Sequence, residues 1–385
     1  MGASSRAQDR PPLRGRIDEG AFGLRVRSIV VDELRFPIEP PLTLAGRLVR
    51  TREYAVVQVT LADGTTGTSY VLTRGRPIAA EAVALAHRVV GAPLESMFAR
   101  EDWAGGHAPD QRAAAVLDHC AWDLLGQAHQ LPIWQLFGDA RPSLPVLLVA
   151  GYRRAGEDDR AMARRLADRV SEGFDLIKIA ADPQPDATTR LLSAIREVVG
   201  PEDLDLVLDL GFAGPDRAQM LDAVRDWKPF GVRWVEDPWP VTATADIAAL
   251  RAAGAVPVAV GDEASPAELR GLLDHAAVDV LRADATTVGG LSGLHRILSD
   301  APVPVSTHVY PETHRHLAFT AGDESPLEMF PSRDPFDFAD RFVDTDDLTP
   351  VDGRLGAPRT PGLGLRYRAE SVTRYRVRST TVEAS

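Results

Sequence analysis

The sequence predicts an α/β fold in which a (β/α) barrel follows an α+β capping domain. Its 385 residues, 44% of them hydrophobic, exceed one average core and match a barrel with a smaller second domain. From Pro145 onward, short apolar runs alternate with amphipathic stretches, which is the pattern of a parallel barrel. The spacing agrees, because a barrel of about 250 residues allots roughly 30 residues to each strand and helix.

An open doubly wound sheet is the alternative fold. It would usually need a Gly-rich phosphate loop after its first strand, and LLVAGYRRAG is a poor match. We therefore assign residues 143–332 to the barrel, with eight strands at VLLVA, LIKIA, LDLVLDL, VRWVE, VPVAV, VDVLRA, VPVST and SPLEM.

The capping domain is expected over residues 23–142. Three strand-like runs come first (LRVRSIVVDELRF, EYAVVQVTLADG and TTGTSYVL), and two helical patterns follow (AAEAVALAHRVVG and APDQRAAAVLDHCAWDLLGQAHQ). Residues 1–22 are polar and rich in Arg, Pro and Ser, so a disordered tail is expected there. In residues 333–385, SVTRYRVRST alternates like a strand, and we expect this segment to return to the cap.

Composition restricts the partners and the compartment. The net charge of −12 argues against long contact surfaces for nucleic acid or anionic membranes. The sequence contains no run of 18 apolar residues, so no membrane span is expected. The start MGASSRAQDRPPLRGR lacks the apolar region of a secretory signal. The single cysteine, Cys120, excludes an intrachain disulfide, lies in an apolar run and is expected to be a buried thiol. These features predict a cytoplasmic protein of metabolism.

Ionisable residues stand at the end of seven successive predicted strands. A barrel carries its chemistry at this rim, in the loops that lead to the helices. A lone Asp there is usually a helix N-cap, and a lone His or Lys is usually structural or solvated. A whole rim of like charges is different, because it is costly unless a cation compensates it. The seven residues are Lys178, Asp209, Glu236, Asp262, Asp284, His308 and Glu328.

Three carboxylates on consecutive strands predict a divalent-ion site. Asp209, Glu236 and Asp262 offer only oxygen ligands, which suit Mg²⁺. The lack of His or Cys among them argues against zinc. A substrate carboxylate would be a natural further partner of the ion.

Several motifs together resemble the enolase superfamily. VRWVEDPWP, VAVGDEAS and RADATTVGGLSG are similar to its elements at barrel strands four, five and six. The cap helix HCAWDLLGQAHQLPIWQLFG and the tail PGLGL extend the resemblance over residues 24 to about 370. Asp284 and His308 look like the Asp–His dyad of the mandelate racemase group, within the mandelate racemase/muconate lactonizing enzyme-like branch. The resemblance implies a barrel of modified TIM type, Mg²⁺ as cofactor, and a homo-oligomer.

The resemblance also implies a reaction. Mg²⁺ would bind a substrate carboxylate, and His308, oriented by Asp284, would remove the neighbouring α-proton. Lys178 and Glu328 would add charge and hydrogen bonds at that carboxylate and stabilise an enediolate intermediate. Glu328 falls where the group places an acid that hydrogen-bonds the substrate carboxylate.

Two departures from the family pattern bear on the reaction type. The second Lys of the strand-two Lys-x-Lys element is Ala180 here, and the strand-three Asn or His is Gly211. With one evident base, acid-sugar dehydration to a 2-keto acid, a lyase reaction of carbohydrate acid catabolism, is the leading hypothesis. A hydroxy-acid racemase or epimerase that uses Lys178 or Tyr310 as second base is an alternative. A metal- and carboxylate-binding homologue without catalysis is another.

The cap is expected to set specificity. Two cap loops close over the barrel mouth in this family, and here they would be PIEPPLTLAGRLVR and VLTRGRP. Glu263 is expected to support the site rather than bind the metal. His314 and His316 are expected at packing or surface positions, and Trp122 and Trp134 in the cap core. The residues assigned to substrate binding are Arg50, Arg74, Arg76 and Tyr310.

Overall fold

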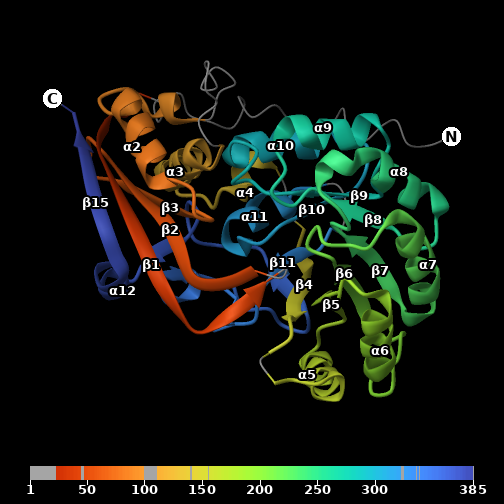
Figure 1. Cartoon of the computed structure of the whole chain (residues 1–385). Helices are drawn as coiled ribbons and strands as arrows, with labels where there is room; N and C mark the ends of the chain where they lie inside the picture. The colour runs from red at the N-terminus through yellow and green to blue at the C-terminus, as the bar shows by residue number, and fades with distance from the viewer. Residues whose placement is uncertain are drawn as a thin grey trace.

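The computed structural model describes residues 23–44, 47–98, 111–138, 141–154, 156–321, 325–334, 336–337 and 339–384. The predicted disordered tail, residues 1–22, lies outside these ranges. Figure 1 shows a cap built on an antiparallel sheet beside a barrel whose helices form its outer layer. The predicted fold class is confirmed.

The cap is a four-stranded antiparallel sheet covered by helices. The strand order is β15-β1-β2-β3, so the C-terminal strand lies at the sheet edge. The strands are β1 (Val26–Leu44), β2 (Arg47–Leu61), β3 (Thr66–Leu72) and β15 (Arg376–Glu383), and the helices are α2 (Ile78–Val89), η2 (Leu94–Met97), α3 (Gln111–Ala128) and α4 (Trp134–Phe137). Cys120 of α3 is fully buried in the core between this sheet and its helices, as predicted.

The barrel closes through eight parallel strands. Its first and last strands pair directly, with Leu327 opposite Val146. All eight predicted runs are strands: β4 (Ser143–Gly151), β5 (Leu176–Ala180), β6 (Asp205–Asp209), β7 (Val232–Glu236), β8 (Val258–Val260), β9 (Val280–Ala283), β10 (Val305–Thr307) and β11 (Leu327–Met329). The outer helices are α5 (Asp159–Ser171), α6 (Pro185–Arg196), α7 (Arg217–Trp227), α8 (Thr244–Ala253), α9 (Pro266–Asp274), α10 (Gly290–Asp300) and α11 (Pro311–Ala318).

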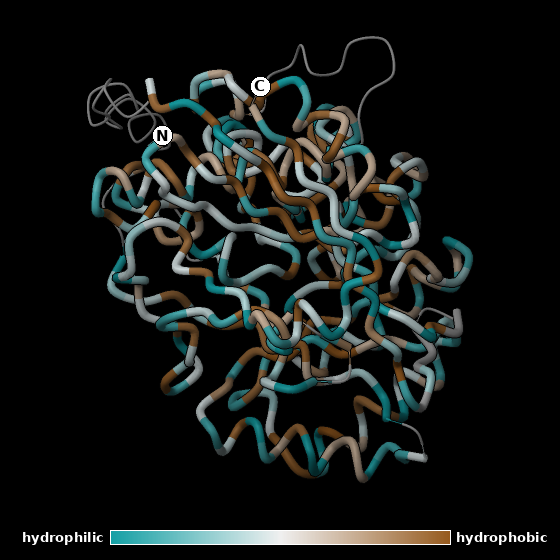
Figure 2. Tube along the Cα trace, turned by 90° about the vertical axis from the view of Figure 1, so that its left-hand side faces the viewer, coloured by the Kyte–Doolittle hydropathy of each residue, from teal (hydrophilic) through white to brown (hydrophobic). Residues whose placement is uncertain are grey.

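Local sequence explains where the outer helices begin. Asp158 and Asp216 cap α5 and α7, and each accepts a hydrogen bond from the backbone N–H three residues later. Ser265 and Glu268 form a reciprocal capping box at the start of α9. Along the helices in Figure 2, hydrophilic and hydrophobic stretches alternate, as expected of helices with one buried side.

The C-terminal segment differs in part from the prediction. The predicted strand SVTRYRVRST covers residues 371–380, but residues 371–375 belong to α12 (Ala369–Tyr375) and the strand β15 covers Arg376–Glu383. The residues between the barrel and α12 contribute β12 (Val343–Thr345), β13 (Arg354–Gly356) and β14 (Leu365–Tyr367). Because β13 pairs with β4, the segment contacts the barrel as well as the cap. The boundaries 23–142, 143–332 and 333–385 stay predictions.

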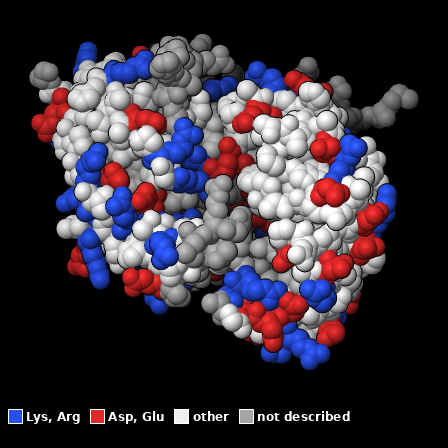
Figure 3. Space-filling view, viewed as in Figure 1, with Lys and Arg blue, Asp and Glu red and all other residues white. Residues whose placement is uncertain are grey.

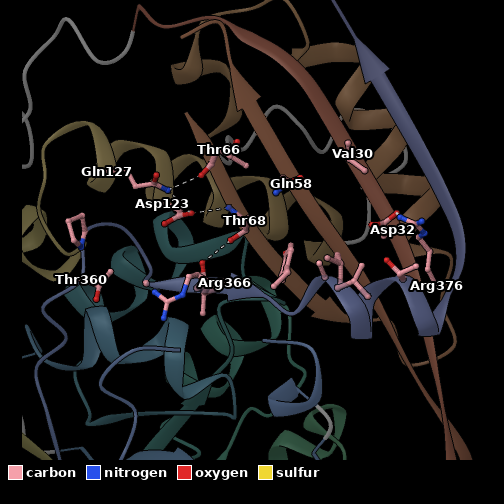
Figure 4. A pocket seen from close by; sticks show the side chains of 18 of the residues that line it. Val30, Asp32, Gln58, Thr66, Thr68, Asp123, Gln127, Thr360, Arg366 and Arg376 are labelled. Carbon is pink, nitrogen blue, oxygen red and sulfur yellow. Dashed lines mark hydrogen bonds and ion pairs between the residues drawn. The ribbon is translucent and has the colours of Figure 1, made fainter. Parts of the chain in front are cut away.

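One buried carboxylate ties the C-terminal segment to the cap. Asp123 of α3 accepts hydrogen bonds from the backbone N–H of Thr68 (2.9 Å) and of Leu363 (2.8 Å). Figure 4 shows Asp123 beside Thr68 and Gln127, on the wall of a cavity of about 690 Å³. Among the described residues, none of the predicted site residues lines this cavity.

The surface shows mixed charge. Acidic and basic side chains are interspersed on the face drawn in Figure 3, and a hollow separates the cap from the barrel there. No helix in the described part of the chain is long and apolar enough to cross a membrane.

Candidate active site

A large cavity lies between the cap and the carboxyl ends of the barrel strands. Its volume is about 1670 Å³. The cap contributes Arg50, Arg52 and Tyr70 to its wall, and the barrel contributes residues at or just beyond its strand ends. The predicted rim residues Asp209, Asp262 and His308, and the predicted substrate-binding residues Arg50, Arg74 and Tyr310, all line it. The structure therefore brings these separately predicted residues to one place.

Asp284 and His308 form a buried pair at the ends of neighbouring strands. His308 Nδ1 lies 3.3 Å from Asp284 Oδ2, and His308 reaches the cavity. Burial opposes charge on the imidazole, but Asp262, the Asp284 hydrogen bond and Glu328 outweigh it and raise the pKa of His308 to about 9. A cation bound to Asp262 would oppose that attraction and favour the neutral imidazole that a general base needs.

His314 lies behind this pair. Its Nε2 accepts a hydrogen bond from Ala285 N (2.9 Å) and lies 3.7 Å from Asp284 Oδ1. Both His314 and His316 are fully buried in α11, so they occupy packing rather than surface positions. Burial lowers the pKa of His314, which leaves it neutral and able to accept the backbone hydrogen bond.

The three predicted metal ligands stand on adjacent strands. Asp209 and Glu236 are register partners at the ends of β6 and β7, and Asp262 follows β8. Lys178 Nζ donates to Glu236 Oε1 (2.7 Å) and lies 3.7 Å from Asp209 Oδ2. Asp262 Oδ2 lies 3.6 Å from His308 Nε2, which places the predicted metal ligands beside the predicted base.

A different trio is the most compact. Among the described residues, the group whose possible ligand atoms all lie within 4.8 Å of one another is Glu263, Asp284 and His308. Glu263 is already neutralised, since it pairs with Arg74 (2.6 Å) and with Arg112. Asp284 already pairs with His308. This trio is therefore explained by internal pairing, and Glu263 joins the cap to the barrel beside the site.

Charge balance favours one divalent ion among the strand-end carboxylates. These groups are buried or nearly so, and their bound cations are Lys178 and Arg282. When all four carboxylates are ionised, the two permanent cations leave a formal charge of −2, which one divalent ion neutralises. Burial raises the pKa of Asp209, and that of Asp262 to about 6, so a bound cation would favour the ionised form of both. The donors are all oxygen, which fits Mg²⁺. The four carboxylates are Asp209, Glu236, Asp262 and Glu328.

Glu328 differs from its predicted place. It accepts hydrogen bonds from Lys178 Nζ (2.9 Å) and from the Arg282 guanidinium, and it is not among the described residues that line the cavity. Burial opposes its charge, but these two cations outweigh burial and lower the pKa of Glu328 to about 2. An ionised carboxylate can only accept hydrogen bonds, so Glu328 cannot donate one to a substrate carboxylate in this arrangement.

Two of the three predicted cap arginines line the cavity and the third does not. Arg50 and Arg74 line the cavity, whereas Arg76 is exposed and is not among the described lining residues. Arg74 is engaged by Glu263 across the junction between cap and barrel. Tyr310 also bridges this junction, because its hydroxyl accepts a hydrogen bond from Leu72 N (2.9 Å).

Sequence reasoning missed four residues of the site. Arg282 stands two residues before Asp284, and Arg52 two residues after Arg50. In a strand, alternate residues share a face, so this spacing was a usable signal for both. Tyr152, directly after β4, donates its hydroxyl to Asp209 Oδ2 (2.8 Å). Arg112 gave no sequence signal for its contact with Glu263.

Two family models match the chain, one over the barrel and one over the cap. The model of the family described as enolase C-terminal domain-like matches residues 161–371. The chain belongs to the enolase superfamily. The N-terminal domain of mandelate racemase/muconate lactonizing enzyme matches residues 26–138, so this superfamily member is of the mandelate racemase/muconate lactonizing enzyme type.

Two curated relatives align with this enolase-superfamily chain over most of its length. It is 25% identical to a D-galactarolactone cycloisomerase of Agrobacterium fabrum (92% of this chain, 99% of the relative). It is 26% identical to an L-talarate/galactarate dehydratase of Salmonella typhimurium (86% and 85%). A crystal structure of that Salmonella typhimurium dehydratase with Mg and L-lyxarohydroxamate superposes with a TM-score of 0.85 at 22% identity, covering 96% of this chain and 97% of the other, which establishes the shared fold.

Proposed function

We propose that this chain is a Mg²⁺-dependent enzyme that removes the α-proton of a carboxylate substrate, most consistently as an acid-sugar dehydratase that yields a 2-keto acid. One observation carries the proposal. His308, paired with Asp284 behind it, lines the cavity, while Ala180 and Gly211 line it at the two positions where the family usually places the opposing base.

A single imidazole suffices for elimination. His308 can take the α-proton and then return it to a β-hydroxyl that departs from the same face of the substrate. Asp284 holds the ring through Nδ1 and leaves Nε2 for the substrate. The proton moves from the α-carbon to the leaving oxygen, so water and an enol form, and the enol becomes the 2-keto acid.

The metal assignment supports this reaction. Asp209, Glu236 and Asp262 would hold Mg²⁺, which when bound supplies Lewis-acid polarisation of the substrate carboxylate. Lys178 is 2% exposed, its ammonium is hydrogen-bonded to Glu236 and Glu328, and it is not among the described residues that line the cavity. Its contribution would be electrostatic.

Racemisation is the weaker alternative. It needs a proton donor on the face opposite His308. Lys178 is held by Glu236 and Glu328, and Tyr310 belongs to the same loop as His308. Tyr152 stands near Ala180, but burial and Asp209 raise its pKa well above the usual value, so it would remain a hydrogen-bond donor to Asp209. The non-catalytic alternative leaves the buried Asp284–His308 pair without a role.

The cavity wall favours a second carboxylate on the substrate. Arg50 and Arg52 line the cap side, and Arg52 is half-buried. Burial and nearby Arg74 lower the pKa of Arg52, while Tyr54 and Asp337 raise it, so a bound carboxylate would help to keep the guanidinium charged. Curated relatives include a dehydratase of talarate and galactarate, and a neighbouring structure contains L-glucarate. We therefore place aldaric acids ahead of monoacid sugars.

The proposal is tested by measuring turnover of a panel of sugar acids. Purified protein with Mg²⁺ is incubated with hexarates and the matching hexonates, and 2-keto acids are detected as semicarbazones. We expect product from at least one hexarate, none with excess EDTA, and none from His308→Asn. Arg52→Gln should raise KM for a hexarate more than for a hexonate. Absence of product across the panel, together with absence of α-proton exchange in D₂O, would shift the evidence to the non-catalytic alternative.

A further inference from the structure

We infer that Arg282 is a built-in cation of the candidate metal centre, which positions Glu236 and Asp262 and competes with a divalent ion for them. The inference rests on the metal site of the proposed function. Arg282 is the first residue of the motif RADATTVGGLSG, but it is not among the predicted ligands and the sequence analysis assigned it no role. It concerns how tightly the chain binds its ion and what holds the carboxylates in place before the ion arrives.

The contacts of Arg282 are unusually complete for a buried arginine. Its side chain is 0% exposed. Nε donates to Asp262 Oδ1 (3.0 Å) and lies 3.4 Å from Glu236 Oε2. Nη1 donates to Ser306 Oγ (2.7 Å), and Nη2 donates to Glu328. Every nitrogen of the guanidinium therefore has a partner, and the planar fork fixes where those partners stand.

These contacts close a ring of alternating charges across the barrel. Glu236 touches both Lys178 and Arg282, and so does Glu328. Two of the three predicted ligands therefore contact Arg282 directly, and Asp209 is on the Lys178 side. Such a ring is self-supporting, because each buried charge has two neighbours of opposite sign.

Competition follows from the same geometry. An ion bound by Glu236 and Asp262 must share or displace the oxygens that Arg282 now contacts. It must also approach a guanidinium of like sign that is shielded from water, where repulsion is strong. Arg282 therefore weakens ion binding while it keeps the ligands positioned. A purely structural arginine would stabilise the fold but leave the ion affinity unchanged.

The experiment compares ion affinity across matched variants of the full chain. Mg²⁺ and Mn²⁺ are titrated calorimetrically into EDTA-stripped, dialysed protein, and the melting temperature is recorded with and without Mg²⁺. The variants are Arg282→Gln and the control Arg315→Gln. Arg315 is equally buried, but it donates to backbone carbonyls of Asp346, Asp347 and Leu363, outside this ring.

We expect Arg282→Gln to bind Mg²⁺ about tenfold tighter or more, because one nearby positive charge is gone. Arg282→Gln should melt at a lower temperature than wild type in EDTA, and Mg²⁺ should raise its melting temperature by more than that of wild type. Arg315→Gln should lose stability but keep the wild-type ion affinity. Equal or weaker Mg²⁺ binding by Arg282→Gln, beside normal binding by wild type, would overturn the inference and leave the proposed function intact.

Other outcomes also decide. Binding by Arg282→Gln but not by wild type would support the inference in its strongest form. Binding by neither would overturn the inference together with the metal site. If Arg282→Gln is unfolded with and without Mg²⁺, Arg282→Lys decides instead. Its single ammonium cannot span Asp262 and Glu328 together, so Mg²⁺ should bind about threefold tighter than in wild type. Unchanged affinity in that variant would refute competition.

Discussion

Glu312 should make the stability of this protein fall as pH rises. Glu312 lies in the first turn of α11, is 4% exposed, and accepts a hydrogen bond from Tyr70 Oη (2.5 Å). Burial raises its pKa to about 7 from the model-peptide value of 4.5, and the Tyr70 hydrogen bond offsets this only in part. The folded protein therefore holds a proton on Glu312 over a pH range in which the unfolded chain does not.

The sign and size follow from this difference. Between pH 4.5 and about 7 the folded state binds more protons than the unfolded state, so the free energy of unfolding decreases with pH and then levels off. Each unit of pKa difference corresponds to about 1.4 kcal/mol, so the ionisation of Glu312 should lower the free energy of unfolding by roughly 2 to 3 kcal/mol between pH 5 and 8. Glu312→Gln stays neutral and should lack this component.

The assay is denaturant unfolding of wild type and Glu312→Gln from pH 5 to pH 8. The free energy of unfolding of the variant, relative to that of wild type, should rise by roughly 2 to 3 kcal/mol from pH 5 to pH 8. Glu370→Gln, at an exposed position of α12, serves as control and should run parallel to wild type. A difference between Glu312→Gln and wild type that does not change with pH would refute the raised pKa.

The remaining predictions concern the site. Asp262→Ala should weaken Mg²⁺ binding, and equal affinity in a titration would remove Asp262 from the ligand set. Tyr152→Phe removes the hydroxyl that bonds Asp209 and should weaken Mg²⁺ binding about 10- to 100-fold, measured by the same titration. His308→Asn should abolish turnover but keep ion binding; near-normal turnover would mean that another residue is the base. In D₂O, a slow α-hydroxy acid should exchange its α-proton in one configuration only, and NMR detection of both enantiomers would favour the racemase alternative.

The barrel and the rim were predictable because both follow short-range periodicity. Eight apolar runs of strand length, each followed by an amphipathic stretch, have few other stable arrangements. Parallel strands present their carboxyl ends at one edge, so Asp209, Glu236 and Asp262 could be placed together from their positions in the runs alone. The C-terminal region was harder to predict from the sequence, because residues 371–375 alternate like a strand but form part of α12.

What the sequence by itself determined is the list of reactive groups and the edge at which they meet, including the absence of a side chain able to act as a base at Ala180 and Gly211. What only the tertiary structure decided is the partner of each group. Glu328 was expected at the substrate, yet two cations bind it and it is not among the described residues that line the cavity. Arg282 was overlooked, yet it contacts two of the predicted ligands. The reason is physical: strand periodicity fixes which way a side chain points, but the length and charge of side chains from other strands fix what it meets there.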